Sequence, residues 1–252
     1  MRPPPSLLAR SLEPLISALW LFFLVWTAIV AVLWLGGSEI VAGIANPGLR
    51  SAATLILQAS DAIWLVLAAA NLYLHLAETE GLARARIIAL AIATAAGAIA
   101  TASAWTGYPL GSVAYTTRLG MKLGPVPFGW PILWFVIVVG SRGLAARILP
   151  RASHRILAGF TGGIAFLTDL NLEPVATKVR LYWFWYLSGS HLPSPPPWPN
   201  YACWFLVAAA LAGLIREQKL ASSGSESWRP ALIVVVLNAM LLLGHLRAAF
   251  GG

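Results

Sequence analysis

The sequence predicts an all-α, polytopic membrane protein with about seven transmembrane helices in a single domain, residues 1–252. Hydrophobic residues make up 59% of the chain and charged residues only 10%, whereas soluble proteins carry about 25% charged residues. The apolar residues also gather in long runs, separated by short charged or proline-rich segments. Both observations exclude an ordinary soluble domain and indicate the bilayer as solvent.

Seven apolar runs are candidates for the helices. A helix needs about 20 apolar residues to cross the hydrocarbon core, with a range of about 17–25. The first three runs meet this length, the fourth and fifth are near its lower limit, and the last two need flanking residues. Six or eight spans therefore also remain open. The runs are residues 15–35, 52–76, 87–105, 125–141, 156–172, 201–215 and 231–246.

The first run is interpreted as a retained span, because it is about twice as long as a signal-peptide core and lacks a clear small-residue cleavage site. With the N-terminus inside and seven spans, 11 of the 17 Lys and Arg residues lie on the N-terminal side. Positive residues favour the cytoplasmic side. We therefore expect a protein of the bacterial cytoplasmic (inner) membrane with a cytoplasmic N-terminus.

Two unusual loops follow the third and fifth runs. Residues 106–124 are rich in Gly and Tyr, and residues 188–200 contain five prolines, which fix the backbone and remove donors. Both loops fall on the same face in the seven-span arrangement, so a pocket between them would open there. Pro174 should kink or end the fifth helix. Residues 175–187 are then expected to form an interfacial amphipathic helix or a short continuation of the span.

Asp169 and Glu173 are the principal candidates for chemistry. Two carboxyls at membrane depth are costly and point to function. Their spacing of four places them on one helix face, where they can act on one group as proton donor and proton acceptor. The alternative is that both lie solvated at the headgroups, with Lys178 or Arg180 as partners.

Asp61 is a second catalytic candidate, since it lies near the middle of the second run. Asn71 and His75 share roughly its helical face, and hydrogen bonds between helices are the alternative role for this group. The rings that begin at Tyr182 are either an aromatic belt at the membrane interface or a lining that stabilises a carbocation through the ring faces.

Several classes of protein and site are disfavoured. The net charge of +8 is spread over short loops, which argues against a nucleic-acid partner, and Cys203 is the single cysteine, without a metal-binding pattern. A retinal protein needs a lysine within its last span, but all three lysines lie outside the runs. A polyprenyl-diphosphate transferase needs further acidic residues for magnesium, and the sequence has no second acidic cluster.

Three motifs together resemble the integral-membrane carotenoid end-group hydratases, over roughly residues 85–215. The first begins Thr106-Gly107-Tyr108-Pro109-Leu110-Gly111 and continues through Tyr115-Thr116, Val126-Pro127, Pro131 and Trp134. The second is Asp169-Leu170-Asn171-Leu172-Glu173-Pro174 with Trp183-Phe184-Trp185, and the third is Pro199-Asn200-Tyr201 with Trp204. The family usually has a glutamate shortly before the Thr-Gly motif and an aromatic residue at the position of Leu110. This sequence has neither.

The resemblance implies that water is added to the terminal isopropylidene double bond of a linear or monocyclic carotenoid within the bilayer. Asp169 would protonate the alkene, Glu173 would activate water, and Asp61 could compensate for the missing glutamate. No cofactor or metal is implied. A related cyclase or isomerase acting through the same cation, and a non-catalytic carrier of pigment or isoprenoid lipid, remain open, as do the individual carotenoid and the oligomeric state. The residues expected to bind the substrate or orient water are Tyr115, Trp134, Tyr182, Trp183, Trp185, Asn200 and Tyr201.

Overall fold

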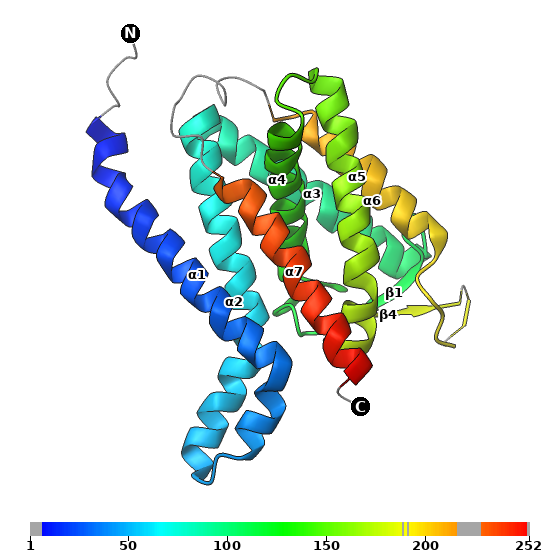
Figure 1. The fold of residues 1–252 in the computed structure, drawn as a ribbon. Helices are drawn as coiled ribbons and strands as arrows, with labels where there is room; N and C mark the ends of the chain where they lie inside the picture. Colours follow the sequence, from blue (N-terminus) through cyan, green and yellow to red (C-terminus); the bar gives the residue numbers. More distant parts are fainter. Residues whose placement is uncertain (1–6, 188, 191, 216–227, 251–252) are drawn as a thin grey trace.

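The structure, a computed structural model, describes residues 7–187, 189–190, 192–215 and 228–250, and in this part of the chain each predicted apolar run overlaps a helix, although the fourth run includes a strand before its helix. Figure 1 shows the resulting helical bundle, with the first helix leaning away from it on one side. The helices are α1 (Leu7–Ala42), α2 (Pro47–Glu80), α3 (Leu82–Thr106), α4 (Gly129–Ile148), α5 (His154–Pro174), α6 (Trp198–Ala212) and α7 (Arg229–Phe250).

Among the described residues, five helices are long and apolar enough to cross a membrane, which supports a polytopic membrane fold. They are α1 from Glu13, α2, α3, α4 and α7. The predicted spans that became α5 and α6 do not meet this criterion. Helix α6 has only 15 residues, and α5 carries Asp169 and Glu173. The two helices that hold the principal candidate residues are thus the ones that fall outside this criterion, α6 because it is too short.

Local sequence signals set the ends of the N-terminal helices. Asn46 caps α2 by accepting a hydrogen bond from the backbone N–H of Leu49, and Pro47 occupies the first helical turn. Gly81 alone separates α2 from α3, with φ of 85°, a conformation that favours glycine. Gly107 ends α3 in the left-handed region and donates to the Ser103 carbonyl.

Helix α4 lies at the centre of the bundle, where it contacts α2, α3, α5, α6 and α7. Its run from Leu133 to Arg142 is buried at every position, as expected for a helix that is apolar on all sides. Helix α5 packs most closely along α6 and also contacts α4 and α7. The acid pair of α5 therefore faces a lining made by α4 and α6.

Two small antiparallel sheets, which the sequence analysis did not predict, connect the helices. Strand β1 (Ser112–Tyr115) pairs with β4 (Trp183–Tyr186), and β2 (Lys122–Leu123) pairs with β3 (Val126–Pro127). The prediction of a helix over residues 175–187 is wrong beyond Val179. A π-helical turn, η1 (Val175–Val179), follows Pro174, and the chain then enters β4. The aromatic residues of β4 favour a strand, and β1 provides its partner from about 70 residues earlier.

Candidate active site

Helix α5 presents Asp169 and Glu173 on one face, and both side chains are buried, with 0% and 1% of their surface exposed. This burial excludes the alternative in which the pair lies solvated at the headgroups. Lys178 and Arg180 do not neutralise the pair either, since Arg180 is paired with Asp61. The carboxyls instead depend on polar partners from α6 and β4, as buried carboxyls must.

Asn200 joins the two carboxyls. Its side-chain Nδ2 donates to Asp169 Oδ2 over 2.8 Å and to Glu173 Oε1 over 3.0 Å. The proline-rich segment before α6 places Asn200 in the first turn of that helix, with Pro197 as the residue before it. One amide therefore holds the acid pair from a helix that α5 packs against.

Strand β4 supplies the remaining partners of Glu173. Successive side chains of a strand point to opposite faces, so Trp183 and Trp185 share the buried face while Phe184 points outward. Their indole Nε1 atoms donate to Glu173 Oε2 over 3.2 Å and 2.8 Å. Glu173 thus accepts three N–H hydrogen bonds, and Asp169 accepts one.

Five buried rings pack against one another beside the acid pair, and we call this packed group the aromatic chamber: Tyr115, Trp130, Trp134, Trp183 and Trp204. Trp134 and Trp204 are stacked, with ring centroids 4.1 Å apart. Trp130 contacts Tyr115, Trp134, Trp183 and Trp204 at centroid distances of 5.0–6.5 Å. The register between β1 and β4, which sets Tyr115 opposite Trp183, closes the group.

The chamber and the acid pair hold five buried polar atoms that have no hydrogen-bond partner within the described residues. Buried donors and acceptors rarely remain unpaired, and these five belong to residues of α4, α5, α6 and β1. They could therefore bind a small polar group such as a hydroxyl or a water molecule. The atoms are Tyr115 OH, Trp134 Nε1, Asp169 Oδ1, Asn200 Oδ1 and Trp204 Nε1.

Tyr115 retains its proton and remains a hydrogen-bond donor in this setting. Burial raises the pKa of its hydroxyl well above the usual range, and the nearby carboxyls of Glu173 and Asp169 raise it further. Burial likewise raises the pKa of Tyr182, whose hydroxyl donates to Asp61 over 2.8 Å. The two tyrosines belong to separate clusters: Tyr115 lies in the aromatic chamber and Tyr182 lies beside Asp61.

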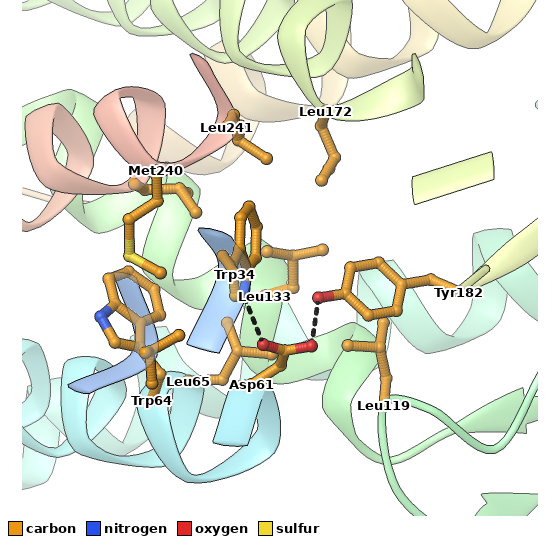
Figure 2. Close-up of a pocket in the computed structure, with 12 residues that line it drawn as sticks. Trp34, Asp61, Trp64, Leu65, Leu119, Leu133, Leu172, Tyr182, Met240 and Leu241 are labelled. Atoms are coloured by element: carbon orange, nitrogen blue, oxygen red, sulfur yellow. Dashed lines mark hydrogen bonds between the residues drawn. The ribbon is translucent and has the colours of Figure 1, made fainter. Parts of the chain in front are cut away.

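Asp61 forms a second buried cluster. Its Oδ1 accepts from Trp34 Nε1 over 2.8 Å, and its Oδ2 accepts from Tyr182 and is paired with Arg180. Figure 2 shows the carboxylate between the rings of Trp34 and Tyr182. The cavity beside it, about 30 Å³ and mainly apolar, has room for about two water molecules. The two clusters are adjacent through the chain, because Tyr182 precedes Trp183.

The structure brings together most of the residues expected from the sequence. Trp183, Trp185 and Asn200 contact the acid pair. Tyr115 and Trp134 belong to the aromatic chamber, and Asp61 and Tyr182 form the second cluster. Tyr201 contacts Phe166, with ring centroids 6.3 Å apart, on another face of α6.

Trp130 and Trp204 were not predicted as site residues, and Arg180 was expected as a possible partner of the acid pair rather than of Asp61. Helical spacing could have identified the first two, since Trp130 precedes Trp134 by four residues and Trp204 follows Asn200 by four. Arg180 had no comparable signal, because its partner Asp61 lies 119 residues away. Within the described ranges, no group of three or more His, Cys, Asp or Glu side chains could hold a metal ion.

Comparisons with known proteins match this chain to carotenoid metabolism. The profile of a family described as carotenoid biosynthesis protein matches residues 60–252. A curated relative, bisanhydrobacterioruberin hydratase of Haloarcula japonica, is 35% identical over 104 residues, which are 40% of this chain and 34% of the relative. The match therefore spans about a third of the relative's length. No solved structure matches the chain.

Proposed function

The chain belongs to the carotenoid biosynthesis protein family, and we propose that it hydrates the terminal isopropylidene double bond of a linear or monocyclic carotenoid. The observation that carries the proposal is the buried Asp169–Glu173 pair beside the aromatic chamber. The relative named as a hydratase supports the same reaction class. A bilayer-embedded site suits a substrate that is insoluble in water.

Asp169 is the proposed acid. Hydrogen bonds donated to a carboxyl favour its ionised form, and Asp169 accepts one such bond whereas Glu173 accepts three. The proton of the pair therefore belongs on Asp169, whose Oδ1 has no partner within the described residues. From there it transfers to the less substituted alkene carbon, which leaves a tertiary cation at the carbon that bears the two methyl groups.

The aromatic chamber would stabilise this cation. The faces of indole and phenol rings attract cations, and the attraction increases when water is excluded. Trp130, Trp183 and Trp204 are buried, and the ring centroid of Trp130 lies 5.1 Å from that of Trp183 and 5.8 Å from that of Trp204. Such a lining also limits side reactions of the cation.

Glu173 would act as the base toward water. A water molecule bound beside the pair gives its oxygen to the cationic carbon and one proton to Glu173, so that a tertiary alcohol forms. The proton returns from Glu173 to Asp169, which restores the pair without an external oxidant or reductant. Asn200, through its unpaired Oδ1, and the Tyr115 hydroxyl are the proposed groups that orient this water.

The test is to produce the protein in cells that make lycopene or gamma-carotene and to analyse the pigments by mass spectrometry. We expect products heavier by one water molecule, and we expect Asp169→Asn to abolish them. Glu13→Gln, which changes an exposed acid on α1, is the matched control and should keep them.

Other outcomes would replace the proposal. New products of unchanged mass would indicate a cyclase or isomerase that passes through the same cation and then loses a proton. Unchanged pigments, with intact protein present in the membrane, would contradict hydration and favour a carrier.

A further inference from the structure

A groove on the side of α3, separate from the aromatic chamber, has a volume of about 660 Å³. One wall is the face of α3 that carries Ala93, Gly97, Thr101 and Trp105, at helical spacing of four. The other wall is the β2–β3 hairpin and the first turn of α4. Its volume lies in the usual range for ligand sites, about 300–1,000 Å³.

We propose that this groove binds the hydrocarbon polyene chain of the substrate while the end group of that chain occupies the aromatic chamber. The inference takes the identity of the ligand from the proposed function and adds a binding site for the unreactive part of the molecule. Pro131 lines the groove, and its neighbour Trp130 lines the chamber. One turn of α4 therefore contributes residues to both the groove and the aromatic chamber.

The chemistry of the walls suits an uncharged chain. The polar groups of the lining side chains are the hydroxyls of Thr94 and Thr101 and the indole N–H of Trp105, and no charged residue contributes. The mouth carries large exposed apolar side chains, with Trp105 at 74% and Leu123 at 72% exposure. Exposed apolar groups of this size mark a surface that meets lipid or a partner, so a ligand dissolved in the bilayer can enter directly.

The length of the groove suits an extended chain. From Ala93 to Trp105 the helix rises about 18 Å, so the wall made by α3 can contact a long stretch of a hydrocarbon chain laid along it.

The groove is also preformed. Pro125, Pro127 and Pro131 fix the backbone of one wall, and the hairpin is closed by hydrogen bonds from the Phe128 N–H to the Met121 carbonyl and from the Gly129 N–H to the Leu119 carbonyl. A fixed groove matches a straight, conjugated rod better than a flexible acyl chain, since neither partner must be ordered on binding.

Gly97 provides the test. A Cβ atom built there meets nothing within 4 Å, and the same is true of Gly159 on α5, outside the groove. Gly97→Leu therefore adds its side chain to the groove wall at a position where the Cβ atom meets no neighbour, and Gly159→Leu is the matched control for adding the same side chain to a helix. Gly97→Ala adds a single carbon and tests tolerance of the site to substitution.

The protein is purified in detergent from pigment-producing cells, and the pigment retained per protein is measured by visible absorbance. We expect Gly97→Leu to retain about tenfold less pigment and to raise KM about tenfold with kcat unchanged, as overfilling a packed site does. Gly97→Ala and Gly159→Leu should match the unmodified protein.

Three results would overturn the groove as the polyene site. They are equal pigment retention by Gly97→Leu, loss of co-purified phospholipid without loss of pigment, and a changed oligomeric state without loss of pigment. The groove proposal and the hydration proposal can fail independently, because retention of pigment requires no catalytic turnover. Selective loss of pigment in a protein that makes no hydrated product supports the groove and contradicts hydration.

Discussion

Asn200 is the residue on which the candidate site converges, because one side-chain amide donates to both carboxyls. An amide in this position holds the carboxyl oxygens at a fixed separation and offers its own oxygen to a further group. No other residue type of this size combines two donors with an acceptor in one plane. The link between the two carboxyls therefore depends on a single side chain from α6.

Replacing Asn200 by leucine, which has a similar shape, should remove both hydrogen bonds and leave two buried carboxyls with fewer partners. We expect hydration to fall by at least about 100-fold, as for the loss of a positioned catalytic hydrogen bond, and stability to fall by about 1–3 kcal/mol. Pigment analysis and detergent-based unfolding measure the two effects. Asn238→Leu is the control, because Asn238 donates to Thr168 and the Val234 carbonyl rather than to the acid pair. Equal activity in both variants would show that Asn200 has no role in the chemistry.

The sequence predicted the acid pair and missed part of its surroundings for a physical reason. Asp169 and Glu173 share a face through local helical geometry, which spacing alone reveals. The partners of Glu173 depend on the pairing of β1 with β4, and such a nonlocal register leaves no periodic signal. The same limit explains why Arg180 was assigned as a possible partner of the acid pair, whereas it pairs with Asp61.

At the scale of elements, the turn from η1 into β4 is the connection that aims the two indoles at Glu173. Leu181 in this turn has φ of 55°, a left-handed conformation that costs a non-glycine residue roughly 1–2 kcal/mol. Its neighbours Arg180 and Tyr182 both bind the Asp61 carboxylate. Asp61 thereby holds the strained turn from both sides. We expect it to be a positioning residue that orients Trp183 and Trp185 toward Glu173.

Asp61→Asn should test this role. The variant leaves the Arg180 guanidinium without its charged partner, and breaking a buried pair costs about 3–5 kcal/mol, although the partial exposure of Arg180 should reduce this value. We expect lower stability, and in the folded protein a lower kcat with little change in KM, since Trp183 and Trp185 lose their fixed orientation.

The double variant Asp61→Asn with Arg180→Gln separates orientation from stability. Removing both charges should recover part of the stability, while kcat should remain low because the turn is still released. Full recovery of kcat in the double variant would contradict the positioning role and leave only an effect on folding.

At the scale of the whole molecule, the site exists only where α5 and α6 pack together. Gly162 allows this approach, because a Cβ atom there would lie 2.6 Å from the Phe205 carbonyl oxygen and 3.0 Å from the Ala209 Cβ. A Cβ atom built on the neighbouring Gly163 meets no atom within 4 Å. Two adjacent glycines of one helix thus differ completely in their surroundings.

Gly162→Ala should separate the helices, lower stability by about 1–3 kcal/mol through overpacking, and reduce hydration because Asn200 moves away from the carboxyls. Gly163→Ala should be neutral or slightly stabilising, since alanine favours helices. Unfolding in denaturing detergent and pigment yield measure both variants. Equal behaviour of the two would contradict the packing seen between α5 and α6.

The stacked indoles of Trp134 and Trp204 have an optical consequence. Two such chromophores, with centroids 4.1 Å apart and planes at 12°, lie close enough for their ultraviolet transitions to couple. Their coupled near-ultraviolet circular dichroism band should change whenever a guest molecule alters the spacing or angle of the pair. The protein thus contains a label-free reporter of occupancy, read without catalysis and without any added dye.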